Sequence, residues 1–595
     1  TLVDTTTNPG DRFTVLEIQR IQPNGTTNFE YGSVPQSKSW DSANKILTWN
    51  YSWGKVKTAF TQVTDRLNIT ISVTNSDTVN TFAGANIYPF FVRFPVQPNG
   101  WDPTTPQVGF NLTGPTVVSA DYVSGMLVLC NDDTALPLYC GLFSNADTPA
   151  YHKYLLWVSA IPFPGQPAFW QLFDRHVFPG KTDTYTISVR FAPSGTPLTN
   201  ICQDIYDRYN QNWPIELCWP DRRPIGRNHM ASPAMGFPGN PRGYFEDGSI
   251  NIYTPSGLAS FQSRILSYAN SSIAVLSNMN SQGMVVWDIE GQQYPHATSY
   301  LGDPRVLPTH AWEIDPVADQ FFQRFRTAGF KIGCTVRPQR LDMTSNSAEQ
   351  VWVGEAEAEQ LLIDKITYAY NRWGMKMFYI DSNGSTGSPI DAQIMRRLLQ
   401  RFPDLLLIPE HENILYYAYT APICELDLGP AEITLPESLL LQYPTAFVCD
   451  YIAEEPYIDQ YYPQLIDGVR RGDILMFRGW FDDSVVNQKV SYIYQQAGDY
   501  IAPTIFMTSP TNGATISGMT NLSAFAWDNT GRPLGVQFKI DGVNFGSEDT
   551  NDPYTVSLNA SSLSAGSHTA TAWVHDKNGL TNTAVVITFI VSGGT

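Results

Sequence analysis

The stretch KMFYIDSNGSTGSPIDAQIMRRLLQRFPDLLLIPE, residues 376–410, contains two short apolar, β-rich runs that a helical segment separates. The runs are Lys376–Asp381 and Leu405–Glu410, and the predicted helix between them is Ile390–Arg401. A strand, a helix and a second strand in this order form a βαβ unit with parallel strands. The run Leu405-Leu406-Leu407-Ile408 is apolar on both faces, which is typical of a parallel sheet covered by helices.

The same alternation continues in both directions, and eight such units in about 275 residues match the size of a (β/α)8 barrel. We therefore predict a TIM barrel over residues 227–501. A doubly wound open sheet is the alternative, but no G-x-G-x-x-G or P-loop motif supports it. The predicted strands are His229–Met235, Met284–Glu290, Lys331–Arg337, Lys376–Asp381, Leu405–Glu410, Pro422–Asp427, Ala446–Asp450 and Asp473–Trp480. The other predicted helices are Asp319–Ala328, Ala356–Arg372 and Pro436–Gln442.

The chain is multidomain, because single cores rarely grow beyond ~250–300 residues. Residues 1–199 predict an N-terminal antiparallel β-sandwich, since short alternating runs are bounded by Gly, Pro, Asn and Asp. A helical linker is predicted over 200–226. Residues 502–595 contain short strands again and predict a second, smaller β-sandwich.

The C-terminal part resembles a bacterial immunoglobulin-like domain. It opens with S-P-x-N-G-A-T-I-S-G at 509–518 and continues with V-Q-F-K-I-D-G at 536–542. Asp552-Pro553-Tyr554 and Gly566-Ser567-His568-Thr569 complete the resemblance. Such domains are often appended to secreted carbohydrate-active enzymes, and the resemblance implies a spacer or adhesive module without chemistry of its own.

Composition narrows the class of ligand. Lys+Arg 37 against Asp+Glu 56 gives a net charge of −19, which argues against binding nucleic acid or anionic membranes. Charged residues are only 16%, and polar uncharged and aromatic residues are abundant, as expected for a secreted or cell-surface protein with a neutral polar ligand. The start at Thr1 fits a mature form whose leader was removed. The apolar stretch Leu155–Phe173 contains three prolines, so no membrane span is predicted.

The cysteines show no C-x-x-C pattern, which argues against a zinc or redox motif. Two pairs are candidate disulfides, Cys130 with Cys140 and Cys202 with Cys218. The cysteines predicted to be buried thiols are Cys334, Cys424 and Cys449. No organic cofactor is expected, and a structural calcium ion stays open as an alternative at the paired aspartates 132–133 or 482–483.

Acidic residues follow several consecutive predicted strands, at the end of the barrel where catalytic groups lie. Asp381 ends the fourth strand and Glu410 the fifth, and neighbouring strands lie about 4.8 Å apart. Retaining glycosidases hold two carboxyl groups about 5–5.5 Å apart, and inverting ones about 6.5–9.5 Å apart. We therefore predict Asp381 as nucleophile and Glu410 as acid/base. Arg337, one strand away, is expected to hold a carboxylate ionised or to bind a sugar hydroxyl.

Other residues of the same strand ends are candidates for binding the sugar. Asp288 and Glu290 are suited to grasping hydroxyl groups, and aromatic side chains to stacking on sugar rings. Glu412, Asp427 or Asp450 could replace Glu410 as the acid. For any single acid the alternative is a helix cap or a loop ion pair, and for any aromatic residue it is packing. The predicted substrate-binding residues are Trp287, Asp288, Glu290, Arg337, Glu412, Asp427, Asp450, Arg478 and Trp480.

A β-sandwich that leads into a barrel resembles the retaining α-glycosidase-type glycoside hydrolases. Many of them place an Asp nucleophile after the fourth strand, in contexts similar to Phe378-Tyr379-Ile380-Asp381. The alpha-amylase superfamily and the endo-alpha-N-acetylgalactosaminidases add a Glu after the fifth strand, which matches Glu410. The alpha-galactosidase and family-31-type alpha-glucosidase clan uses an Asp after the sixth strand, which matches Asp427. The resemblance implies retaining hydrolysis of an α-linked glycosidic bond.

The sequence thus predicts a secreted glycoside hydrolase whose partner is an oligosaccharide, a polysaccharide or a glycoprotein glycan. The alternative is a non-catalytic cell-surface protein that binds glycans or self-assembles and has kept a glycosidase-like barrel. A homo-oligomer or surface assembly stays open. A polysaccharide lyase is a third interpretation. It would need a basic site around Arg337 and Arg478 and an acidic substrate, which the net charge of −19 disfavours.

Overall fold

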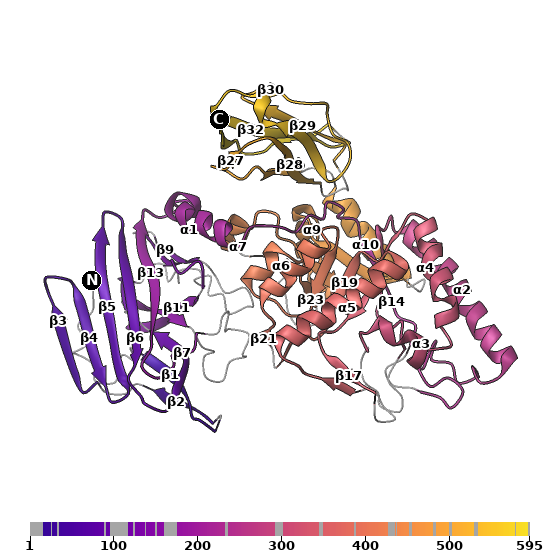
Figure 1. Ribbon diagram of the computed structural model, residues 1–595, viewed down its shortest axis with the longest axis horizontal. Coiled ribbons are helices and arrows are strands. Elements are labelled where there is room, and N and C mark those ends of the chain that lie inside the picture. The colour runs from indigo at the N-terminus through magenta and orange to yellow at the C-terminus, as the bar shows by residue number, and fades with distance from the viewer. Residues whose placement is uncertain are drawn as a thin grey trace.

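The computed structural model describes most of the chain in three successive parts (Figure 1). The described residues are 16–24, 26–31, 35–87, 91–95, 117–122, 125–136, 138–148, 151–159, 175–231, 236–291, 301–343, 349–385, 388–425, 435, 437–451, 455–479, 484–498, 502–528, 533–577 and 579–592.

The N-terminal part contains two antiparallel sheets among its described residues, as the sequence predicts. One sheet has the order β11-β12-β7-β1-β2 with β8 paired to β12, and the other β3-β4-β5-β6-β13-β10-β9. The strands are β1 Leu16–Ile21, β2 Thr27–Tyr31, β3 Ser37–Asp41, β4 Ile46–Tyr51, β5 Gly54–Val63, β6 Arg66–Asn75, β7 Thr81–Ile87, β8 Phe91–Pro95, β9 Val117–Tyr122, β10 Gly125–Asn131, β11 Tyr139–Thr148, β12 Tyr151–Ser159 and β13 Thr182–Ala192.

Alternating side chains of the two sheets share one core, which makes this part a sandwich. On β6 every second residue from Ile69 to Val73 is fully buried, as the two-residue period of a strand requires. Trp53, beside β5, stacks on Tyr51 at 4.7 Å and meets Phe82 of the other sheet edge-on at 5.2 Å. The aromatic contact therefore joins the two layers.

Helix α1, Leu198–Asn212, follows the sandwich and carries Cys202. Cys130, Cys202 and Cys218 are thiols outside any disulfide, so both predicted pairs, Cys130 with Cys140 and Cys202 with Cys218, are wrong. Cys202 faces Cys130 of β10 instead, with the two Sγ atoms 3.5 Å apart. Sequence neighbourhood is a poor guide here, because the helix packs its cysteine against a strand that lies far earlier in the chain. Cys334, Cys424 and Cys449 are buried thiols, as predicted.

The central part is a sheet whose described neighbours all run parallel, in the order β22-β19-β16-β15-β14-β25-β24-β23. The amide of Ala421, just before β23, donates to the carbonyl of Leu407 in β22 at 3.0 Å and so joins the two ends of this order. The closed parallel sheet is consistent with a TIM-like barrel. Its strands are β14 Ile225–Asn228, β15 Gly283–Val286, β16 Lys331–Val336, β19 Met377–Ile380, β22 Leu406–Pro409, β23 Ile423–Glu425, β24 Cys449–Tyr451 and β25 Ile474–Arg478.

Seven of these strands overlap the predicted ones, whereas the first is displaced. β14 ends at Asn228, directly before the predicted strand His229–Met235, of which residues 232–235 lie outside the described residues. The helices of this part are α2 Pro255–Asn278, α3 Leu307–His310, α4 Asp315–Thr327, α5 Glu355–Trp373, α6 Ala392–Arg401, α7 Glu437–Gln442, α8 Glu455–Gln460, α9 Tyr462–Arg471 and α10 Ser484–Ala497. Short hairpins follow two strands, with strands β17 Arg340–Asp342, β18 Glu349–Val351, β20 Gly384–Ser385 and β21 Ser388–Pro389.

The C-terminal part packs two further sheets around their own core, in which Phe538, Tyr554 and Phe589 are buried. The described strands are β26 Thr504–Ser509, β27 Thr515–Ile516, β28 Met519–Trp527, β29 Gly535–Ile540, β30 Val543–Asn544, β31 Tyr554–Asn559, β32 Gly566–His575, β33 Thr581–Thr583 and β34 Ile587–Val591. An immunoglobulin-like β-sandwich is the architecture that the sequence predicts here.

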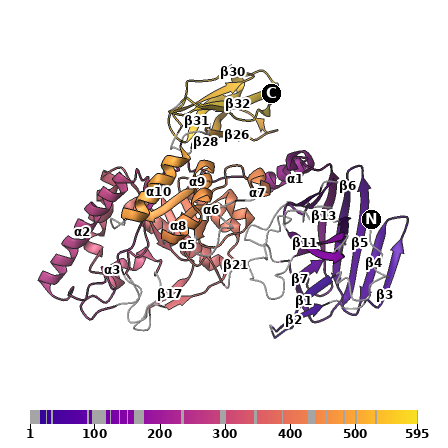
Figure 2. The ribbon, with the colours of Figure 1, turned by 180° about the vertical axis from the view of Figure 1, so that it is seen from behind.

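The sandwich lies beside the barrel and the C-terminal domain lies above it, as both views of the ribbon show (Figures 1 and 2). Trp527 of β28 provides one contact between the C-terminal domain and the barrel. Its ring lies 5.0 Å from the guanidinium of Arg222 and covers Gly472, where an added Cβ would come within 2.6 Å of the ring. Among the described residues, no helix is long and apolar enough to cross a membrane.

Candidate active site

Asp381 and Glu410 come directly after two adjacent barrel strands. The Asp381 amide donates to the Val336 carbonyl of β16 and the Glu410 amide to the Ile380 carbonyl of β19, each at 3.0 Å. The parallel ladder therefore continues through both acids and places them at the same level. The predicted pair thus stands side by side at the C-terminal ends of β19 and β22.

Asp381 is nearly buried, at 4% exposure, and three N–H or O–H groups hold it. Arg337 Nε donates to Asp381 Oδ2 at 2.6 Å, and a second guanidinium nitrogen contacts the same oxygen. The Ser382 hydroxyl lies 3.2 Å from the other carboxylate oxygen. Arg337 therefore supplies a positive charge beside Asp381.

Glu410 is held by Ser382, the residue that follows Asp381. The Ser382 amide donates to Glu410 Oε2 at 2.6 Å, and His411 Nε2 lies 3.6 Å from that oxygen. The Glu410 side chain keeps 26% of its surface exposed, so solvent reaches it. The two carboxylates consequently lie on either side of Ser382, one bound by its hydroxyl and one by its amide.

Ser382 adopts an unusual backbone conformation, with a φ of 50° that residues other than glycine rarely take. Gln339 Nε2 donates to the Ser382 carbonyl at 2.7 Å and fixes this turn. Asn383 exchanges two hydrogen bonds with the backbone of His411, each at 2.7 Å. Burial lowers the pKa of His411, while the charge of Asp381 acts in the opposite direction. Hydrogen bonds therefore join the segments after β19 and β22 to each other.

Aromatic rings pack at the level below the acids. Trp287 stacks on Tyr379 with ring centroids 4.4 Å apart and lies 5.8 Å from the ring of Tyr451. The guanidinium of Arg227 lies 3.8 Å from the Tyr451 centroid. Trp287 is only 3% exposed, so it packs within the barrel and does not offer a free face for stacking on a sugar.

Two other predicted acids face the interior of the protein. Both oxygens of Asp288 accept backbone N–H groups, from Met230 at 2.8 Å and from Ala231 at 2.9 Å, and the residue is fully buried. Glu290 is also fully buried, and its carboxylate makes no hydrogen bond to any described residue. Burial raises the pKa of Glu290 to about 8, and the charges of Asp303 and Asp288 add to the rise. Neither acid is placed to grasp sugar hydroxyls.

The remaining candidates are spread around the barrel. Glu412 is 2% exposed and lies after β22 has ended at Pro409. Asp450 is fully buried in β24 and helps to raise the pKa of Tyr494 on α10, although burial is the larger cause. Arg478 ends β25 and lies opposite Arg227 in the parallel ladder of β14 and β25. Asp427 and Trp480 lie outside the described residues.

No group of three His, Cys, Asp or Glu side chains among the described residues could hold a metal ion. At the proposed calcium position, Asp132 pairs with Arg208 at 2.7 Å and Asp133 with Arg175 at 2.9 Å. One oxygen of each carboxylate is therefore already paired with an arginine. The other position, 482–483, lies outside the described residues.

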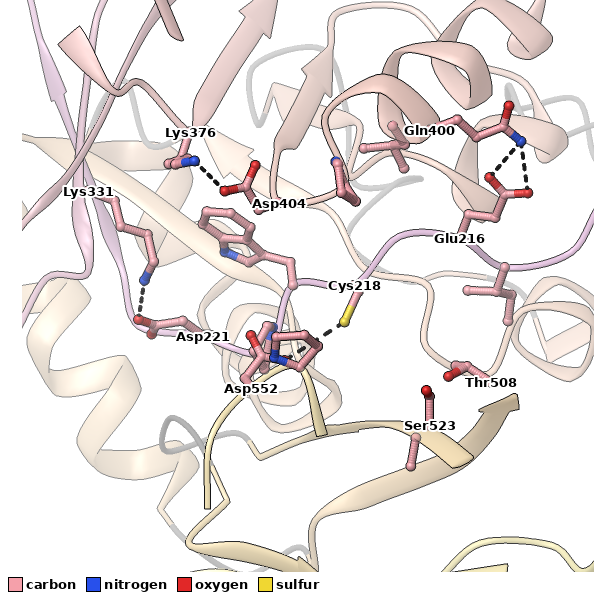
Figure 3. Close-up of a pocket in the computed structure, with 17 residues that line it drawn as sticks. Glu216, Cys218, Asp221, Lys331, Lys376, Gln400, Asp404, Thr508, Ser523 and Asp552 are labelled. Carbon is pink, nitrogen blue, oxygen red and sulfur yellow. Dashed lines mark hydrogen bonds and ion pairs between the residues drawn. The ribbon is translucent and has the colours of Figure 1, made fainter. Parts of the chain in front are cut away.

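A cavity of about 800 Å³ lies at the opposite end of the barrel, between the starts of its strands and the C-terminal domain (Figure 3). Its charged groups are paired, Lys331 with Asp221 at 2.7 Å and Lys376 with Asp404. Ser523 and Thr508 of the C-terminal domain face them across the space (Figure 3). The cavity therefore lies apart from the two predicted catalytic acids.

The sequence did not identify Ser382, Gln339 or Asn383 as part of the site. Ser382 and Asn383 directly follow a predicted strand end, and this position is the signal that could have found them. Gln339 carries no comparable signal, because only the folded loop brings it to Ser382.

Residues 503–572 match the family model described as a bacterial Ig domain, which confirms that expectation. No curated protein matches the chain. Among solved structures, the endo-beta-1,4-mannanase from Thermotoga petrophila is 10% identical over 63% of this chain and 99% of its own, with a TM-score of 0.24. The cycloalternan-degrading enzyme from Trueperella pyogenes is 8% identical over 81% and 80%, with a TM-score of 0.34. A beta-arabinopyranosidase is 10% identical over 91% and 92%, with a TM-score of 0.31. All three scores are below 0.5, and the function proposed below rests on the site residues.

Proposed function

We propose that the protein is a glycoside hydrolase that cleaves an α-linked glycosidic bond by a retaining mechanism. The observation that carries the proposal is the pair of carboxylates at the ends of adjacent strands, joined through Ser382: its hydroxyl contacts Asp381 and its amide binds Glu410. Two opposed carboxyl groups are the machinery that hydrolysis of this bond requires. The barrel end at which they lie is the end that carries active sites in this architecture.

In the proposed first step, a carboxylate oxygen of Asp381 attacks the anomeric carbon while Glu410 donates its proton to the leaving oxygen. The glycosidic bond breaks, and the sugar becomes an ester of Asp381. In the second step Glu410 takes a proton from water, whose oxygen attacks the same carbon and releases the Asp381 carboxylate. Arg337 and the Ser382 hydroxyl orient Asp381 throughout, and solvent access at Glu410 admits the water.

The environment of the two acids suits these different roles. Asp381 is nearly buried, and the Arg337 guanidinium holds it in one position, as a nucleophile requires. Glu410 is partly exposed and must exchange protons with a leaving group and with water. A neutral or weakly charged glycan is the proposed substrate, since a net charge of −19 disfavours an acidic one. Secretion belongs to the proposal and is supported by the low charged fraction and the bacterial Ig domain.

The test is a screen of aryl α- and β-glycosides with the wild-type protein and with Asp381→Asn and Glu410→Gln. We expect hydrolysis of at least one α-glycoside, and loss of kcat/KM by at least about 10³-fold for Asp381→Asn. Glu410→Gln should lose less on substrates with activated leaving groups, because these need little protonation, and more on natural glycans.

The matched control is Asp467→Asn, which removes an exposed carboxylate of α9 that pairs with its helix neighbour Arg470. It should leave the hydrolysis rate unchanged. Full activity of Asp381→Asn would remove the nucleophile assignment. No hydrolysis of any glycoside by the wild-type protein, together with binding of the same sugars, would favour the non-catalytic glycan-binding alternative.

A further inference from the structure

Lys365 is a charged residue in a place where an apolar one is expected. Helix α5 turns a stripe of buried residues toward the barrel, at Ala358, Leu362, Lys365, Ile366, Ala369 and Trp373. Lys365 is fully buried within this stripe. A buried ammonium group is costly unless hydrogen bonds and an opposite charge satisfy it. Its contacts therefore reveal what it does.

The ammonium group of Lys365 binds two backbone carbonyls of one loop, the segment after β16. Nζ donates to the Arg337 carbonyl at 2.7 Å and to the Gln339 carbonyl at 2.8 Å. Asp303 Oδ2 lies 3.6 Å away and balances the charge. Burial lowers the pKa of Lys365 to about 8, so the group is still mostly charged at neutral pH, and its hydrogen bonds are charge-assisted.

Each of the two carbonyls belongs to a residue whose side chain is connected by hydrogen bonds to one of the proposed catalytic acids. Arg337 binds Asp381 through its guanidinium. Gln339 binds the Ser382 carbonyl, and the Ser382 amide binds Glu410. The second side of the loop is fixed by the Arg337 amide, which donates to the Gly302 carbonyl at 3.0 Å. The loop can thus shift only if the bonds of Lys365 are broken or lengthened.

We propose that Lys365 is a positioning residue that sets the geometry of both catalytic acids through the Arg337–Gln339 loop. The inference rests on the proposed function for its catalytic consequence, but the structural coupling stands without it. Lys365 itself is fully buried, and its ammonium group donates to the backbone of the loop, so it is not placed to bind the substrate. It acts by holding the backbone of Arg337, which binds Asp381, and of Gln339, which binds Ser382.

The test compares Lys365→Met with Lys376→Met. Methionine keeps the length of the side chain and removes its N–H donors, and Lys376 is a matched lysine at the start of the segment that leads into β19. Hydrogen exchange of peptides that contain Ser382 needs no substrate. We expect Lys365→Met to speed exchange of the Ser382 amide about tenfold or more, because its bond to Glu410 loses support, and Lys376→Met to leave it unchanged.

Kinetics with any glycoside that the screen identifies gives the second readout. A misplaced catalytic group costs about 10²-fold in rate, so kcat should fall by about that factor in Lys365→Met, with KM nearly unchanged. In Lys365→Ala, n-propylammonium should restore part of kcat and slow the Ser382 exchange again. Tetramethylammonium has the charge but no N–H donor, and it should restore neither.

Gln339→Met provides a milder variant if the lysine variants fail to fold. It removes only the bond to the Ser382 carbonyl and should still speed exchange of the Ser382 amide. Unchanged Ser382 exchange in folded Lys365→Met, or in Gln339→Met, would overturn the positioning role whatever the activity. If the wild-type protein hydrolyses no glycoside, the proposed function is overturned, and the exchange result for Ser382 still stands.

Discussion

Glu290 is an acid in the interior of the barrel. Its carboxylate is fully buried without a hydrogen bond from a described residue, and its pKa of about 8 lies far above the ordinary 4.5. The folded protein therefore holds a proton on Glu290 at pH values where the unfolded chain has released it. Stability must then fall as pH rises from about 4.5 to about 8.

Glu290→Gln tests this dependence, because glutamine has nearly the same shape and cannot ionise. We expect the free energy of unfolding to match that of the wild type near pH 5 and to exceed it by about 1–3 kcal/mol at pH 8. Urea denaturation at pH 5, 6, 7 and 8 measures the difference. Equal dependence on pH in both proteins would mean that Glu290 is already ionised in the folded state.

At the level of single residues, the sequence identified the acids after β19 and β22 because position after an apolar run is visible in one dimension. It could not show that Asp288, which also follows a strand, is fully buried. The Met230 and Ala231 amides of the loop after β14 bind the Asp288 carboxylate. Such contacts depend on the fold of a neighbouring segment and leave no periodic pattern.

At the level of elements, strand periodicity located seven of the barrel strands but not the first. The chain enters β14 through Pro224 and leaves it at Asn228, a run of Ile225, Gly226, Arg227 and Asn228 in which only one residue is apolar and large. Arg227 and Asn228 of this strand are buried and polar, and Asn228 Nδ2 donates to the Ser272 hydroxyl of α2 at 2.8 Å. Lys365 was missed for the related reason that a lysine interrupts the apolar stripe of α5.

The parallel ladder of β15, β16 and β19 depends on glycines at the points of closest approach. A Cβ added to Gly333 of β16 would lie 2.0 Å from the Met377 carbonyl oxygen of β19. Because backbone cannot yield there, Gly333→Ala should destabilise the protein by at least about 2 kcal/mol. Gly354→Ala is the control: no atom lies within 4 Å of its added Cβ, and it should lose only about 0.5–1 kcal/mol, because alanine is a poorer N-cap of α5 than glycine. Thermal unfolding of both variants checks the prediction, and equal midpoints would contradict it.

At the level of the whole molecule, the C-terminal domain is fixed to the barrel through a site that the sequence does not reveal. Arg222 is fully buried, and its three guanidinium nitrogens make no hydrogen bond to a described residue. It lies between two aromatic rings instead, 3.4 Å from the Phe447 centroid and 5.0 Å from that of Trp527. Composition and motifs defined the C-terminal domain, but which of its residues meets the barrel is decided only by the tertiary fold.

Trp527→Ala should loosen this contact. We expect a loss of about 3–5 kcal/mol, the usual cost of removing a large buried aromatic side chain, and separate unfolding transitions for the C-terminal domain and the rest of the chain. Differential scanning calorimetry resolves the transitions. Trp527→Phe keeps an aromatic face over Arg222 and should retain one coupled transition. A single unchanged transition in Trp527→Ala would show that other contacts hold the domain.

The most direct test of the two-carboxylate site is the mass of the protein after incubation with activated fluoroglycosides of α configuration. These reagents form the glycosyl ester quickly and hydrolyse it slowly, so a retaining enzyme accumulates the covalent intermediate. We predict one added sugar per chain, located by peptide mass spectrometry on Asp381 and absent from Asp381→Asn. A sugar attached to a different carboxylate, or glycoside hydrolysis with inversion at the anomeric carbon, would contradict the assignment.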